Sequence, residues 1–267
     1  MTNREILDIA LRQSAEDISC KAEDLLKTEN VVVLSKKNDH ARRYLTLPFS
    51  CQLVSYGNNV VASVAPELKE IVSDYINRYE FYHCFETPNM IALQEKLTPL
   101  GLDICFMAEY FLPDMESLKE LSCPFTLRIM KPDDFASLYL PEWSNALCEK
   151  RKHLDMLAVG AYDGETLVGL AGCSADCDTM WQIGVDVLPA YRKKGVASAL
   201  TSRLALETIA CGKVPFYCCA WSNVASARNA IRSGFRPAWV EMTAKPQAFI
   251  QEMNENQIRF FPKERLL

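Results

Sequence analysis

A short basic loop that ends in glycine contains the residues best suited to bind an anion. The loop Arg192-Lys193-Lys194-Gly195 follows a predicted strand that ends near Leu188 and precedes an apolar, helically spaced segment that starts at Val196. The first N–H groups of a helix have no partner within the helix, and the helix dipole adds positive charge there. Glycine lets the backbone approach a ligand closely. The segment therefore predicts a phosphate or pyrophosphate site.

A second polar group opens the next predicted helix. Asn223 is followed by Ser226, and Gly234-Phe235 closes the segment that starts at Val224. Asparagine is favoured as an N-cap, and glycine is favoured just after a helix. Neither Gly-x-x-x-x-Gly-Lys-Ser/Thr nor a Gly-x-Gly-x-x-Gly after a strand occurs in the sequence, which argues against the common nucleotide-binding loops.

These two motifs resemble the signatures of the GNAT superfamily of acyl-CoA N-acyltransferases. The residues that match its two motifs are Arg192, Gly195 and Ala197 in the first and Asn223, Ser226 and Gly234 in the second. The resemblance covers residues 125–244, and the whole chain is similar to bacterial members with an extra N-terminal domain.

The resemblance implies that acetyl-CoA or another acyl-CoA is the co-substrate, without a metal. Backbone groups of Val185, Asp186 and Val187 would pair with the pantetheine arm, and an N–H there would polarise the thioester carbonyl. The pyrophosphate would be held by Arg192, Lys193, Lys194, Gly195, Val196, Ala197 and Ser198. Asn223 and Ser226 would contact the cofactor where two strands separate. For Lys193 and Lys194 a solvated surface loop is the alternative.

The sequence departs from the family in the side chains that are available for proton transfer. The implied reaction is direct attack of an amine on the thioester in a ternary complex, and a protonated amine must first lose a proton. The tyrosine acid and the glutamate base of many members correspond to Ala230 and Cys218 here. We predict Glu142 or Cys218 as the catalytic side chain. The alternatives are an exposed surface acid and an inert packed cysteine.

The predicted activity is transfer of an acetyl or longer acyl group to a primary amine of a small molecule or a peptide. A non-catalytic acyl-CoA sensor or interaction protein is the alternative, because the usual acid and base are missing. A net charge of −5 argues against nucleic-acid and membrane-surface partners. The acceptor, the acyl-chain length and the choice between monomer and homodimer stay open.

The cysteines indicate a reducing compartment. Their number, 11, is odd, and they are scattered without a Cys-x-x-Cys pair, so reduced thiols are favoured over disulfides. The three histidines, His40, His83 and His153, have no metal-ligand spacing. The N-terminus lacks the apolar core of a signal peptide, and no apolar run approaches a membrane span of about 20 residues. We therefore expect a cytoplasmic protein.

Two α/β domains are predicted to position the motifs. For residues 125–245 we predict a GNAT-like, mixed and mostly antiparallel sheet flanked by helices. Residues 1–120 are predicted to form an N-terminal α/β domain of unknown role. Residues 246–267 are predicted to form a C-terminal tail. Strands are expected at 42–47 and 81–85, and a hairpin at 50–64. Because this hairpin precedes a helix, as the strand before Pro189 does, we hypothesise a degenerate copy of the C-terminal layout. The alternative is that any two segments in which strands and helices alternate resemble each other at this level of detail.

Overall fold

The computed structural model describes residues 1–260. They form two compact units that are each assembled from separate stretches of chain. Unit 1 comprises residues 1–17, 38–45 and 108–239, and unit 2 comprises residues 18–37, 46–107 and those from 240 onward. The predicted domain limits stay a prediction, and residues 261–267 of the predicted tail lie outside the described residues.

Unit 1 contains the mixed, mostly antiparallel sheet that the sequence predicts. Its strands follow the order β10-β4-β9-β8-β7-β6-β5. Their bounds are β4 Leu102–Pro113, β5 Thr126–Met130, β6 Asp155–Asp163, β7 Thr166–Ser174, β8 Met180–Val187, β9 Val214–Ala220 and β10 Phe235–Pro246. The pairs from β5 to β8 and the pair β4–β9 are antiparallel, whereas β8 and β9 are parallel. The predicted α/β fold class is therefore confirmed for this unit.

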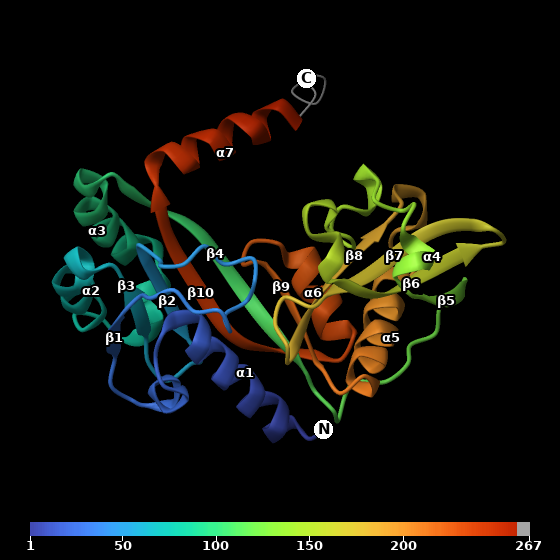
Figure 1. Cartoon of the computed structure of the whole chain (residues 1–267), viewed down its shortest axis with the longest axis horizontal. Helices are drawn as coiled ribbons and strands as arrows, with labels where there is room; N and C mark the ends of the chain where they lie inside the picture. Colours follow the sequence, from blue (N-terminus) through green and yellow to red (C-terminus); the bar gives the residue numbers. More distant parts are fainter. Residues whose placement is uncertain (261–267) are drawn as a thin grey trace. The chain divides into compact units, whose positions relative to one another are not determined.

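Helices cover this sheet. α5 (Val196–Ala210) packs against β6, β7 and β8, and α6 (Val224–Arg232) packs against β9 and α5. Both helices are visible in Figure 1, with α1 (Asn3–Ile18) drawn in blue. Shorter helices lie in the connections: α4 Pro132–Phe135, η5 Pro141–Trp143, η6 Glu149–Leu154 and η7 Pro189–Tyr191.

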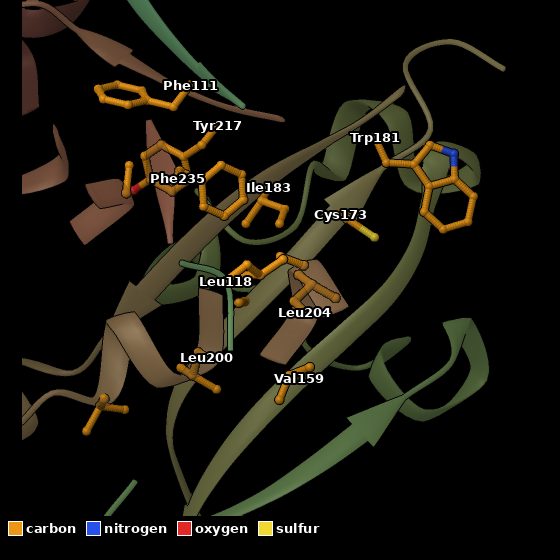
Figure 2. Packing of buried hydrophobic residues seen from close by; sticks show 14 of the residues in the cluster. Phe111, Leu118, Val159, Cys173, Trp181, Ile183, Leu200, Leu204, Tyr217 and Phe235 are labelled. Atoms are coloured by element: carbon orange, nitrogen blue, oxygen red, sulfur yellow. The ribbon is translucent and has the colours of Figure 1, made fainter. Parts of the chain in front are cut away.

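The core of unit 1 lies between α5 and the sheet. Leu200 and Leu204, one helical turn apart on α5, are completely buried together with Val159 on β6. Figure 2 shows these residues with Ile183 and Tyr217 from the parallel strand pair. Burying a large apolar side chain stabilises a fold by about 1.5–3 kcal/mol. This packing fixes α5, and with it the basic loop, onto β8.

The predicted caps of α6 are present, and a glycine occupies the turn between β6 and β7. Gly164 adopts a left-handed φ of 60° in the β6–β7 hairpin, and Gly234 adopts a φ of 91° after α6. Asn223 is the N-cap of α6, and its side chain accepts a hydrogen bond from the N–H of Ser226. The chain after α6 continues as the single strand β10.

Unit 2 contains further strands and helices. Its strand order is β1-β3-β2-β10-β4, with β1 at Val31–Leu34, β2 at Cys51–Ser55 and β3 at Val61–Val64. The helices are η1 Ala22–Leu26, η2 Pro66–Leu68, α2 Lys69–Ile76, η3 Phe81–Phe85, α3 Thr87–Leu97, η4 Thr98–Leu100 and α7 Gln247–Phe260. The predicted hairpin at 50–64 is confirmed as β2 and β3, which pair antiparallel.

Two predicted strands of the N-terminal half are wrong. Residues 81–85, whose aromatic residues suggested a strand, form a 3-10 helix, because their backbone is bonded locally and the O–H of Tyr75 donates to the carbonyl of Cys84. Residues 42–47 form a turn. Asp17 accepts from the N–H of Arg42, and the carbonyl of Asp176 accepts from the N–H of Arg43. The backbone groups of both stretches therefore form hydrogen bonds with partners that do not belong to a neighbouring strand.

The hypothesised copy extends over one hairpin and the helix that follows it. β2 and β3 form an antiparallel pair before α2, as β7 and β8 do before α5. Beyond that point the strand orders differ. The parallel neighbour of β8 is β9, the next strand along the chain, whereas the parallel neighbour of β3 is β1, which precedes the hairpin.

Candidate functional site

A cleft opens where the parallel strands β8 and β9 separate. They pair from Met180 opposite Val214 to Ile183 opposite Tyr217, after which β8 continues to Val187 and β9 pairs with β4. The resulting cleft has a volume of about 640 Å³. Its lining consists of Asn145, Gln182, Ile183, Gly184, Val185, Asp186, Val187, Arg192, Ala197, Tyr217, Cys218, Cys219, Ala220, Asn223, Ala225, Ser226 and Asn229.

The β8 edge of the cleft presents backbone hydrogen-bonding groups. The N–H of Leu188 donates to the carbonyl of Val168 on the β7 side, at 3.0 Å. Backbone groups alternate along a strand, so those of Val185 and Val187 point to the opposite edge, towards the cleft. The carbonyl of Val187 accepts from the Nε of Arg192 at 2.9 Å. The N–H and carbonyl of Val185 therefore face the cleft as a donor–acceptor pair.

The basic loop places helix amides at the end of this strand. Lys193 and Gly195 both adopt left-handed φ values, 62° and 82°, and Gly195 is the N-cap of α5. The first helical bond joins the N–H of Ala199 to the carbonyl of Gly195, so the N–H groups of residues 196–198 precede it and have no helical acceptor. Arg192 and Ala197 line the cleft. This is the arrangement that favours a phosphate group.

A polar network joins β9, α6 and α5 on the helix side of the cleft. The hydroxyl of Tyr217 lies 2.9 Å from the Oγ of Ser226. The Oγ of Ser198 donates to the Oδ1 of Asn229 at 3.0 Å, and the Nδ2 of Asn229 donates to Thr201 at 3.0 Å. Burial raises the pKa of Tyr217, and its hydrogen bonds with Ser226 and Asn229 partly oppose that effect. The phenol is therefore protonated at neutral pH.

Asp186 connects the strand β8 to the loop 145–147 opposite it. Its carboxylate accepts hydrogen bonds from the N–H and the Nδ2 of Asn145, at 2.8 and 2.6 Å, and from the N–H of Ala146, at 3.0 Å. The side chain thus faces the 145–147 loop rather than α5. The alternation of side chains along a strand does not by itself tell which face of the sheet the Asp186 side chain lies on.

Glycines let this loop lie directly on the sheet. A Cβ atom on Gly184 would lie 1.8 Å from the carbonyl oxygen of Asn145, and one on Gly172 would lie 2.1 Å from that of Ala146. Gly172 and Gly184 are directly opposite each other on β7 and β8. The loop backbone therefore forms a wall of the cleft that any larger residue at these positions would displace.

The structure brings together most of the predicted site residues. Those in the lining are Val185, Asp186, Val187, Arg192, Ala197, Cys218, Asn223 and Ser226. Those outside it are Glu142, Lys193, Lys194, Gly195, Val196 and Ser198. The Sγ of Cys218 accepts from the Nε2 of Gln182 at 3.1 Å, whereas Glu142 is exposed on η5.

Sequence reasoning missed several residues of the cleft. Tyr217, Gln182, Asn145 and Asn229 line it without belonging to either motif. For Tyr217 the available signal is a hydroxyl group within the otherwise apolar stretch 214–220. Asn145 lies far from the motifs in sequence, and its place in the lining depends on Asp186.

The described part of the chain has neither a metal-binding cluster nor a membrane-spanning helix. Within residues 1–260, no cluster of three or more His, Cys, Asp or Glu side chains could hold a metal ion. Over the same residues, no helix combines the length and apolar character needed to span a membrane.

Residues 116–235 match the sequence model of the acetyltransferase (GNAT) family. No curated protein matches the chain. Among solved structures, a protein of Novosphingobium aromaticivorans described as a GNAT acetyltransferase is 17% identical over 54% of this chain and 66% of its own, with a TM-score of 0.44. A GCN5-related N-acetyltransferase of Sphaerobacter thermophilus is 13% identical over 90% of this chain and 92% of its own, with a TM-score of 0.49.

A third similar structure contains a ligand. A Salmonella typhimurium protein described as an acetyltransferase, solved with its cofactor acetyl-CoA, is 20% identical over 47% of this chain and 95% of its own, with a TM-score of 0.36. This chain spans about two thirds of the Novosphingobium protein, with 66% covered. The family matched by the sequence model transfers acyl groups from acetyl-CoA. The residues that match the GNAT acetyltransferase model, 116–235, include the whole lining of the cleft.

Proposed function

We propose that the protein transfers an acetyl or longer acyl group from acyl-CoA to the primary amine of a small molecule or a peptide. One observation carries this proposal. Where β8 and β9 separate, the unpaired edge of Val185 faces a cleft whose lining also includes Ala197, in the first turn of α5. An extended, amide-containing arm ending in a pyrophosphate fits this combination of a strand edge and helix amides.

The two ends of the cofactor would be held by different groups. The pyrophosphate would lie at the N–H groups of residues 193–198, with Arg192, Lys193 and Lys194 adding positive charge. The pantetheine amides would pair with Val185, and the N–H of Val185 or Val187 would polarise the thioester carbonyl. Asn223 already caps α6 through its Oδ1, which leaves its Nδ2 as the donor to the cofactor.

Direct attack of the amine nitrogen on the thioester carbon would form the amide and break the C–S bond. The attacking nitrogen must lose a proton on the way. Of the two predicted catalytic side chains, Cys218 lines the cleft and Glu142 does not. We therefore propose that Cys218 borders the reacting atoms and that water in the cleft accepts the proton.

A non-catalytic acyl-CoA sensor is the second candidate. The observation that favours it is Ala230, a completely buried alanine at the position of the family's usual tyrosine acid. Calorimetry with acetyl-CoA, followed by measurement of free thiol across a panel of amines, separates the two functions. Binding with thiol release that depends on the amine supports acyl transfer. Binding without release for every amine and acyl chain refutes it.

The pyrophosphate site can be tested with two matched glycine variants. Gly195→Glu introduces a carboxylate at the helix amides and should lower acetyl-CoA affinity at least tenfold by charge repulsion. A glutamate at position 195 also strains the backbone, because φ is left-handed there, at 82°. The control is therefore Gly164→Glu, at a position where φ is also left-handed, at 60°. Neither added Cβ meets an atom within 4 Å. Equal affinities of the two variants would contradict this placement of the pyrophosphate.

A further inference from the structure

We infer that the hydroxyl of Tyr217 faces the thioester sulfur and donates a proton to it as the C–S bond breaks. This inference rests on the proposed function and deepens it, because it assigns the acid that the helix α6 lacks. Tyr217 comes from the strand β9 and lies in neither sequence motif.

The position of Tyr217 at the fork of the two strands is the first argument. Its pairing with Ile183 is the last one between β8 and β9, so the cleft opens from this residue onward. An arm bound along Val185 would run past this point. Tyr217 lines the cleft, although only 5% of the residue is exposed. The ring is fixed by packing at centroid distances of 6.4 Å to Phe111 and 6.3 Å to Phe235.

The orientation of the hydroxyl is the second argument. It lies 2.9 Å from the Oγ of Ser226, and Ser226 is one turn into α6, at the wall of the cleft. Ser226 also borders the residue whose side chain we assign to the cofactor, Asn223, through the helix cap. The phenolic oxygen is thus held beside the cofactor groups while its ring stays in the core.

The buried Ala230 is the third argument. Ala230 and Tyr217 belong to the same packed cluster, with Ala230 completely buried. A methyl side chain at this position of α6 has no group that could donate a proton. Among the described residues that line the cleft, Tyr217 is the one tyrosine. The phenol of Tyr217, on the strand β9, therefore supplies the proton donor on the side of the cleft next to α6.

The proton balance of the step is complete without another reactant. The amine nitrogen forms a bond to the carbonyl carbon, and the C–S bonding pair passes to sulfur. The O–H proton of Tyr217 moves to that sulfur to give the CoA thiol. The proton lost by the nitrogen passes to the phenolate through Ser226 and water, so Tyr217 is regenerated and the net transfer is one proton from the amine to CoA.

The test compares Tyr217→Phe with Tyr162→Phe. Tyr162 is a partly exposed tyrosine on β6 of the same unit, its hydroxyl lies 3.8 Å from the sulfur of Met130, and it is outside the cleft lining. The phenylalanine keeps the ring, so the fold and the acetyl-CoA affinity should be unchanged in both variants. We expect kcat of Tyr217→Phe to fall on the order of 100-fold at an unchanged KM, and that of Tyr162→Phe to stay at the wild-type value.

A second measurement needs no turnover. A hydroxyl that donates to sulfur stabilises the thiolate, so the thiol pKa of bound CoA should be higher in Tyr217→Phe than in the wild type, by roughly 1. Thiolate absorbance during a pH titration of the CoA complex reports this pKa. The other titratable or charged groups in the lining, Asp186, Arg192, Cys218 and Cys219, are the same in both proteins and cancel in the difference.

The outcomes separate the two proposals. An unchanged kcat in Tyr217→Phe, with an active wild type, overturns the inference and leaves acyl transfer intact. A wild type that binds acetyl-CoA but transfers nothing overturns the proposed function, and the thiol titration then decides whether Tyr217 faces the sulfur. Equal thiol pKa values in the wild type and the variant refute that contact.

Discussion

Removing the carboxylate of Asp186 should release the 145–147 loop from the strand β8. Three donors depend on this group: the N–H and Nδ2 of Asn145 and the N–H of Ala146. Water can replace the carboxylate for the exposed Asn145. It cannot readily do so for Ala146, which is 4% exposed. An unsatisfied buried donor costs about 1–3 kcal/mol.

The expected loss of unfolding free energy in Asp186→Ala is therefore about 2–3 kcal/mol, most of it from Ala146. Asp186→Asn keeps one acceptor oxygen and should lose about half as much. Urea unfolding followed by tryptophan fluorescence measures both values. Asp178→Ala is the control, since Asp178 forms a surface ion pair with Arg43 and should change the stability little.

Hydrogen exchange adds a local measurement to this prediction. If the loop detaches before the unit unfolds, the N–H groups of Asn145 and Ala146 should exchange faster in Asp186→Ala, while those of α5 stay protected. A stability loss below about 0.5 kcal/mol combined with unchanged exchange at both amides would refute the role assigned to Asp186.

Three further predictions follow from the same unit and from the cysteines. Burial raises the pKa of Asp176 despite the nearby Arg151, so the folded state favours its protonated form and loses stability as pH rises through that pKa. Asp176→Asn should consequently gain stability relative to the wild type between about pH 4 and 7, and urea unfolding at both pH values checks the sign. Gly184→Ala should cost about 1–3 kcal/mol, because its methyl group would overlap the carbonyl oxygen of Asn145, and thermal unfolding measures the loss. Burial raises the pKa of Cys51 and of Cys173 to about 12. Both thiols should resist iodoacetamide at neutral pH while the exposed Cys211 reacts, as peptide mass spectrometry would show.

The sequence was sufficient for elements that are determined by local signals. The helix α5, its left-handed Gly195 and the cap Asn223 on α6 follow from residue types within one turn of the chain. The same holds for the hairpin turn at Gly164. Such features need no knowledge of the partner elements, because the signals lie in the segment itself.

Features that depend on distant partners could not be predicted from the sequence. The aromatic run 81–85 has strand-like composition, but Tyr75, on another element, takes the carbonyl of Cys84. The direction of Asp186 depends on the amides of Asn145 and Ala146. The place of Tyr217 in the cleft depends on where β8 and β9 stop pairing. Tertiary contacts decided each of these cases.

The place of β4 in the sheet of unit 1 limits how the acetyltransferase region can be excised. β4 lies between β9 and β10, yet its residues 102–113 precede the stretch 116–235 that the family model matches. A fragment cut at those limits would lose the strand that pairs with Tyr217's neighbours Cys218 and Cys219, and would expose their backbone edge. Expression of such a fragment should give an aggregating product in which the β9 wall of the cleft has collapsed. A minimal protein needs the chain upstream of residue 116, at least from Ala108, where β4 begins to pair with β9.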